Sequence, residues 1–205
     1  EYRAAQRLLG KLGGSPVTLL TGTLVWGTER DRTLLMSDDR GDGLVLKAEA
    51  IIVAAGAYDR PTAFPGWTLP GVWTAGGAQA MLKSQRIVPG RQILVAGAGP
   101  LLLPVATALA AAGATVVGVV EATTRLEWAR QAHRMIGHWD RMGDFLRYEA
   151  ALLHARVPRY FGHAVIRAEG RDGVERATIA AVDRHWRVTP GTEQTVGVDL
   201  VCIGY

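Results

Sequence analysis

The chain has 205 residues, of which 48% are hydrophobic and 20% are charged, with a formal net charge of +4 at pH 7. This composition is typical of a globular protein with one or two cores and excludes a disordered chain. Lys and Arg are spread along the sequence without a basic block, so we expect no nucleic-acid binding. The chain starts at Glu1 without a signal segment, and we interpret it as an internal piece of a longer protein.

Residues 1–60 are predicted to be the C-terminal part of a nucleotide-binding domain, made of a helix, a β-meander and a closing strand. The amphipathic pattern of residues 2–12 predicts the helix, and two glycines after it predict its end. An apolar stretch over residues 48–57 that ends in small side chains predicts the closing strand. The meander strands are predicted from three apolar runs between polar turns, at residues 17–26, 32–37 and 44–46.

Residues 61–90 are predicted to be an inter-domain crossover, because Pro, Gly and Trp are frequent there, with a short helix over residues 76–84. An NAD(P)-binding-like Rossmann domain of the three-layer α/β class is predicted for residues 91–205. The remaining elements are predicted as strands at 92–96, 115–120, 158–168, 174–183 and 195–203, a helix at 100–112, and a helical pattern over 124–152 with breaks near Gly137 and Gly143.

The run of residues 93–120 contains no charged side chain, and it is long enough to span a membrane. Glycines and prolines interrupt it, however, and buried parallel strands are apolar on both faces without any lipid. We therefore interpret the run as strand, tight turn, helix and second strand, and we expect no membrane span.

A nucleotide-loop motif follows the first strand of this run. Gly97 permits a tight turn, Gly99 lets the backbone approach a pyrophosphate, and the next helix presents free N–H groups at its start. Leu102 stands where the third glycine of the fingerprint is usual, and a leucine there is expected to displace the helix from the strand. The candidate residues of this second nucleotide site are Gly97, Ala98, Gly99, Pro100, Leu101, Leu102, Glu121 and Gly204.

Glu121 ends the predicted second strand, where an acid accepts hydrogen bonds from an adenosine ribose. A carboxylate there disfavours a 2′-phosphate, so NAD or ATP is a better candidate ligand than NADP. A Rossmann domain that has lost its nucleotide is the alternative, because folds outlive their sites.

A second motif lies at residues 51–57, where a strand ends in Ala55, Gly56 and Ala57. Small residues there let the backbone lie against a flavin dinucleotide. A buried strand that ends in a turn would explain the motif equally well by itself. The Rossmann unit that follows favours the flavin interpretation, because the two features are consistent with one fold.

These motifs resemble a group of two-domain flavoproteins. Residues 53–56 are similar to an ATG signature, with Ala55 where Thr is usual. FPGWTLPGV at residues 64–72 and TAGGAQ at residues 74–79 resemble the FAD-binding α subunits of opine oxidases, hydrogen cyanide synthases and amino-acid dehydrogenases. These are proteins of the pyridine nucleotide-disulfide oxidoreductase type. The resemblance covers residues 48–121 and extends to the closing strand before Tyr205, and that family also carries Leu at the position of Leu102.

The resemblance implies a flavin enzyme that oxidises the C–N bond of an amino acid or related amine and passes electrons to partner subunits. Its cofactor would be FAD, contacted by Val25, Ala55, Gly56 and Ala57. In such proteins a first glycine-rich loop holds the FAD pyrophosphate, and this chain lacks that loop. We therefore expect the chain alone to bind FAD poorly and to be inactive.

Two alternatives stay open. One is an NAD(P)H-dependent flavoprotein reductase of the disulfide reductase type, against which Leu102 and the lack of a CxxC motif both count. The other is a non-catalytic nucleotide-binding scaffold module in a multisubunit assembly.

The remaining polar residues receive structural interpretations. The five His residues form no metal-binding pattern, so no metal is expected. The single cysteine, Cys202, is predicted to be a small buried hydrophobe, as fits a reducing cytoplasm. Asp59 and Arg60 are interpreted as a salt-bridged loop pair. No catalytic side chain is assigned, because in flavin enzymes the cofactor performs the redox step.

Overall fold

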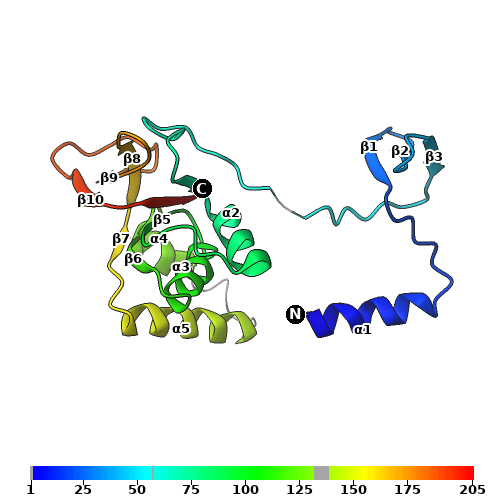
Figure 1. Cartoon of the computed structure of the whole chain (residues 1–205), viewed down its shortest axis with the longest axis horizontal. Helices are drawn as coiled ribbons and strands as arrows, with labels where there is room; N and C mark the ends of the chain where they lie inside the picture. The colour runs from blue at the N-terminus through cyan, green and yellow to red at the C-terminus, as the bar shows by residue number, and fades with distance from the viewer. Residues whose placement is uncertain (1, 57, 132–138) are drawn as a thin grey trace. The chain divides into compact units, whose positions relative to one another are not determined.

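The computed structural model describes residues 2–56, 58–131 and 139–205 of the chain (Figure 1). The contacts divide the chain into two compact units, Glu1–Gly56 and Ala57–Tyr205.

The first unit contains one helix and a three-stranded antiparallel sheet in the order β1-β2-β3. The predicted helix and meander are therefore both present. The strand predicted from residue 17 begins seven residues later, because Gly22 takes a left-handed φ of +63° in a turn before it. The bounds are α1 (Tyr2–Gly13), β1 (Leu24–Thr28), β2 (Thr33–Ser37) and β3 (Gly43–Lys47).

The closing strand predicted at residues 48–57 is wrong for the described residues, since residues 50–56 form no strand. The side chains of Ile52 and Val53 are 92% and 82% exposed. A buried parallel strand needs neighbours that pair with its N–H and C=O groups and cover its apolar side chains. No strand described in this unit pairs with the segment. The segment therefore has the apolar sequence of a buried strand but does not form one.

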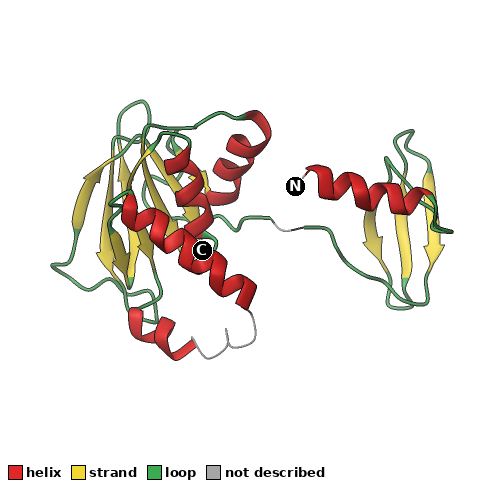
Figure 2. Ribbon diagram, turned by 90° about the horizontal axis from the view of Figure 1, so that it is seen from below, coloured by secondary structure: helices red, strands yellow, loops and turns green. Residues whose placement is uncertain are grey.

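The second unit has three layers around a five-stranded parallel sheet in the order β4-β11-β5-β6-β7. Helices gather on one side of these strands (Figure 2), and an antiparallel meander of order β10-β9-β8 covers the other. The predicted α/β class with a parallel sheet and a meander is confirmed. The sheet and meander strands are β4 (Val72–Thr74), β5 (Gln92–Gly97), β6 (Thr115–Glu121), β7 (Arg159–Phe161), β8 (His163–Glu169), β9 (Arg176–Ala181), β10 (Gln194–Gly197) and β11 (Leu200–Gly204).

Alternate residues of the parallel strands face two separate cores. Ile93 and Val95 of β5 pack with the helices, whereas Leu94 and Ala96 of the same strand pack with the meander. This period of two explains why the strands are apolar throughout, as expected for a sheet covered on both faces. The helices of this unit are α2 (Ala75–Ala80), the π-helical turn η1 (Met81–Gln85), α3 (Leu102–Ala111), α4 (Arg125–Gln131) and α5 (Trp139–His154).

Three boundaries of the second unit differ from their predictions. The predicted break near Gly143 is wrong, because α5 continues through this position. The break near Gly137 lies outside the described residues. The single strands predicted at 158–168 and 195–203 are each two strands that belong to different sheets. Gly162, at φ +67°, allows the first of these changes of direction.

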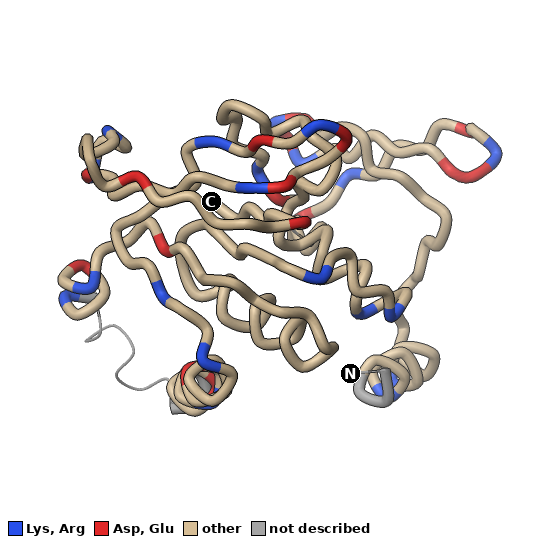
Figure 3. Tube along the Cα trace, turned by 60° about the vertical axis from the view of Figure 1, so that its left-hand side comes forward, with Lys and Arg blue, Asp and Glu red and all other residues tan. Residues whose placement is uncertain are grey.

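The run of residues 93–120 forms strand, turn, helix and strand, as predicted. Among the described helices, none has the length and apolar character needed to cross a membrane. Basic and acidic positions are interspersed along the Cα trace (Figure 3), and the run itself carries neither.

Candidate nucleotide site

The fingerprint loop joins the end of β5 to the start of α3 at the carboxyl edge of the parallel sheet, where ligands bind in open α/β sheets. Gly99 takes φ +93°, and a Cβ built on it would meet no atom within 4 Å, so its backbone is accessible. Gly97 is tightly enclosed, because a Cβ there would overlap the carbonyl oxygen of Gly204. The backbone N–H of Ala98 donates to that same carbonyl over 3.0 Å. The predicted residues Gly97, Ala98, Gly99 and Gly204 are thus brought together.

Leu102 is 1% exposed and lies in the core at the first turn of α3. A Cβ built on Gly97 would lie 2.9 Å from its Cδ2 atom, and one on Gly204 would lie 3.6 Å away. The leucine side chain therefore fills the space over the two strand ends. The preceding Pro100 and Leu101 are exposed and form the turn that leads into the helix.

Glu121 ends β6, and its carboxylate points into the protein. The side chain is 2% exposed, and it is the one charged residue that is buried in the described part of the chain. Its oxygens accept hydrogen bonds from the N–H of Gly99, at 3.1 and 3.3 Å, and from the N–H of Thr123 at 2.9 Å. The backbone donor of the second fingerprint glycine is thus directed at a carboxylate of the protein itself. A ribose approaching Glu121 would have to share these oxygens with the two backbone donors.

Two aromatic residues beside this edge were not found by sequence reasoning. Tyr205 follows Gly204 directly, and its hydroxyl accepts a hydrogen bond from the N–H of Val165 over 3.2 Å. Burial raises the pKa of Tyr205 to about 12. The rings of Trp186 and Tyr205 are nearly perpendicular to each other, with centroids 5.1 Å apart. The partners are far apart along the chain, so no local pattern could have indicated this pair.

The interpretation of Asp59 and Arg60 as a salt-bridged pair is corrected by the contacts of Asp59. Its Oδ2 accepts a hydrogen bond from the N–H of Gly76 over 2.8 Å, at the start of α2. A Cβ on Gly76 would overlap this carboxylate, so the glycine is what permits the approach. Thr74 provides the other cap, because its hydroxyl accepts from the N–H of Gly77.

The candidate FAD residues lie in the other unit, Glu1–Gly56, apart from Ala57, which is outside the described residues. Val25 is on β1 and is 51% exposed. Ala55 and Gly56 are exposed, and Gly56 takes φ +79° with no atom within 4 Å of a Cβ built on it. The backbone of this segment is therefore open to a flat ligand.

Cys202 is fully buried on β11, as predicted. Burial raises the pKa of its thiol to about 12, which makes it unreactive at neutral pH. Within the described ranges, no group of three or more His, Cys, Asp or Glu side chains is placed to hold a metal ion.

The parallel sheet, the glycine loop and the meander define a dinucleotide-binding domain of the kind found in FAD- and NAD(P)-dependent oxidoreductases. Residues 2–205 match the pyridine nucleotide-disulphide oxidoreductase family, and the chain belongs to it.

The chain is similar to components of two known oxidoreductases. It is 35% identical over 182 residues to the HcnB subunit of hydrogen cyanide synthase from Pseudomonas protegens, covering 88% of this chain and 39% of that protein. It is 34% identical over 167 residues to an opine oxidase subunit of Rhizobium meliloti, covering 77% of this chain and 30% of that protein. The chain thus spans well under half of either relative. The crystal structure of T. acidophilum thioredoxin reductase shares the fold, with a TM-score of 0.61 at 14% identity over 98% of this chain and 58% of that one.

Proposed function

We propose that this chain is part of the FAD-binding subunit of a flavin-dependent enzyme that oxidises the C–N bond of an amino acid or related amine. In this proposal, electrons leave through partner subunits. The observation that carries it is the similarity to subunits of hydrogen cyanide synthase and opine oxidase, at about one residue in three over most of the chain. Partner subunits are part of the proposal because both relatives are subunits of their enzymes.

The proposal divides the chain into three regions. Residues 1–60 are the C-terminal part of the FAD-binding domain, residues 61–90 are the crossover, and residues 91–205 are the second Rossmann domain. The exposed apolar side chains of Ile52 and Val53 support the first assignment, because such a surface requires cover from further protein.

The residues present are compatible with the backbone side of an FAD site. Val25, Ala55 and Gly56 would hold the cofactor together with a pyrophosphate loop from elsewhere in the protein, and Ala57 completes the proposed set. Removal of two electrons from a C–N bond is chemistry that a flavin supplies when bound. This chain contributes small side chains and an unobstructed backbone at Gly56. No large side chain therefore stands where the cofactor would lie.

The second Rossmann site supports an amine dehydrogenase better than a nicotinamide-dependent reductase. Leu102 fills the space over the ends of two strands. The carboxylate of Glu121 accepts a hydrogen bond from the N–H of Gly99, which is the donor that a pyrophosphate would need. The buried thiol of Cys202 does not supply a redox dithiol. The candidate ligand of this site remains NAD or ATP.

A second candidate function is an NAD(P)H-dependent flavoprotein reductase. One observation favours it: strand β5, the glycine loop, helix α3 and Glu121 at the end of β6 form the arrangement that binds a dinucleotide. A third, a nucleotide-binding scaffold, would keep the fold without the reaction.

Anaerobic reduction of the full-length flavoprotein separates the three functions. We expect the flavin absorbance to bleach with an amino acid or secondary amine, and not with NADH or NADPH. Faster bleaching by NADH than by any amine would establish the reductase, and bleaching by neither would favour the scaffold. The cytoplasm is the proposed location, which the single buried cysteine supports.

A further inference from the structure

The hairpin connection between β9 and β10 contains a hydrogen-bonded turn that the proposed function does not use. We call residues 183–187 the Trp186 turn. It is closed by a β-bridge between Val182 and Val188. Inside it, the N–H of Trp186 donates to the carbonyl of Asp183 over 2.9 Å.

The carboxylate of Asp183 holds the turn in one conformation. Its Oδ1 accepts hydrogen bonds from the N–H groups of His185 and Arg187, at 2.8 and 3.0 Å. Its Oδ2 accepts from the Arg187 guanidinium at 2.8 Å. These hydrogen bonds, with that guanidinium, lower the pKa of Asp183 to about 2, so the carboxylate stays charged at neutral pH. The turn is thus preorganised.

Trp186 is in an unusual state for a large side chain. Its φ is +61°, a left-handed conformation that glycine and asparagine favour and that bulky residues rarely adopt. Its ring packs nearly perpendicular to that of Tyr205, yet the residue remains 52% exposed. Strained backbone of this kind persists where the surrounding structure enforces it, and it is concentrated at functional positions.

Two exposed arginines, Arg184 and Arg187, lie within two residues of Trp186 in the turn. The Nε of Arg184 donates to the His185 imidazole over 3.1 Å. The side chain of Arg187 is 76% exposed although it pairs with Asp183. The one carboxylate of the turn is already occupied by its own hydrogen bonds. The turn therefore presents an exposed aromatic ring and, with two arginines and one aspartate, a net charge of +1.

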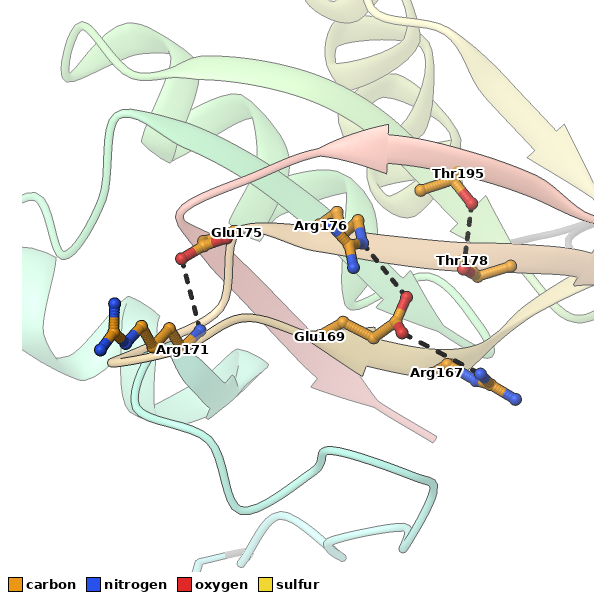
Figure 4. Close-up of polar contacts among 7 residues, drawn as sticks. All are labelled: Arg167, Glu169, Arg171, Glu175, Arg176, Thr178 and Thr195. Carbon is orange, nitrogen blue, oxygen red and sulfur yellow. Dashed lines mark hydrogen bonds and ion pairs between the residues drawn. The ribbon is translucent and has the colours of Figure 1, made fainter.

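The charged groups on the outer face of the same meander form a comparable cluster of ion pairs. Glu169 pairs with Arg176 at 3.2 Å and with Arg167 at 4.0 Å (Figure 4). Thr178 and Thr195 share a hydrogen bond between neighbouring strands. Among these residues none is aromatic, so this face has the character of an ordinary solvated surface, and the exposed indole is what distinguishes the Trp186 turn.

We propose that the Trp186 turn anchors this chain on an acidic surface of another subunit of the dehydrogenase. Trp and Arg are enriched among the residues that carry most of the energy at protein interfaces. A turn that is ordered before binding loses little conformational freedom on association. The net positive charge of the turn, from Arg184 and Arg187 against the single carboxylate of Asp183, determines the acidic character of the partner. Since Trp186 contacts Tyr205, the docked subunit lies beside the carboxyl edge of the parallel sheet.

This inference rests on the proposed function, because it requires a partner subunit. The test uses the full-length protein and the other subunits of its enzyme, separately purified, with dissociation constants measured by sedimentation at two salt concentrations. Trp186→Gly removes the ring and relieves the strained φ, so the variant is expected to fold. We expect it to weaken the complex about thirtyfold or more. Arg184→Gln should weaken binding at low salt more than at high salt.

Arg171→Gln is the matched control, because Arg171 lies in the turn at the opposite end of the same meander (Figure 4). It should leave the dissociation constant unchanged. A complex that forms normally with Trp186→Gly overturns the inference and leaves the proposed function standing. Failure of the wild-type protein to form any complex with those subunits sinks the multisubunit function itself. Loss of a homodimer with Trp186→Gly, or equal effects of Arg184→Gln and Arg171→Gln, also overturns the proposed docking site.

Discussion

The carboxylate of Glu121 and the backbone N–H of Gly99 are joined by a hydrogen bond of 3.1 Å, with the second oxygen 3.3 Å from the same nitrogen. This contact ties the end of β6 to the loop that follows β5. The loop is thereby stabilised by the protein itself, without a ligand. Because Glu121 is 2% exposed, its charge depends on these backbone donors for solvation.

Glu121→Gln should therefore destabilise the protein by about 1–3 kcal/mol, because an amide cannot accept as strongly and its NH₂ group faces the donors of Gly99 and Thr123. Urea unfolding measures this change. Glu175→Gln is the control, since the Glu175 carboxylate is exposed and accepts from the N–H of Arg171. We expect it to stay within about 0.5 kcal/mol of wild type. Equal losses for the two variants would contradict the structural role of Glu121.

Gly97→Ala tests the close approach of β5 and β11. The added methyl group would overlap the Gly204 carbonyl and lie 2.9 Å from Leu102 Cδ2, so the backbones would have to separate. We expect a loss of about 3 kcal/mol in urea unfolding. Gly143→Ala is the control, because a Cβ there meets nothing within 4 Å, and a helical alanine should stabilise by about 0.5–1 kcal/mol. A mild effect of Gly97→Ala would show that the two strands can move apart at little cost.

The parts of the fold that were predictable are those with local signals. The unit from β5 to β6 has its turn glycines and apolar periods within one stretch of sequence, and its form was predicted. The segment containing Ile52 was predicted as a strand, but strand formation requires neighbours that its own sequence does not specify. The inward direction of Glu121 and the contact between Trp186 and Tyr205 depend on residues brought together by folding, so spacing alone could not indicate them.

Cys202 should be unreactive in the native protein. Burial raises its pKa from 9.0 to about 12, so a thiol reagent at pH 8 should modify it only after unfolding. The folded state holds the proton more tightly than the unfolded state. This contribution to stability is therefore complete below about pH 9 and is lost as the pH rises toward 12. Cys202→Ala should remove that part of the alkaline loss, and rapid labelling of the native thiol would contradict the burial.

Asp183 provides a test of the Trp186 turn that leaves the indole in place. Its pKa is lowered from 3.8 to about 2, first by the backbone hydrogen bond from Arg187 and then by the bond from the Arg187 side chain. Its contribution is therefore present above pH 3.8 and is lost as the pH falls through about 2. The near-UV circular dichroism of the Trp186–Tyr205 pair, obtained as wild type minus Trp186→Phe, should follow that titration.

In Asp183→Asn the same signal should already be reduced at pH 7, because a neutral amide cannot replace the charge-assisted bonds that hold the turn. Asp172→Asn, at an exposed position in the turn at the other end of the meander, should keep the signal. If Asp183→Asn retained the full signal, the carboxylate would not be what orders the turn. If it lost the signal but still bound its partner with wild-type affinity, preorganisation would not contribute to docking, since the indole and both arginines are still present.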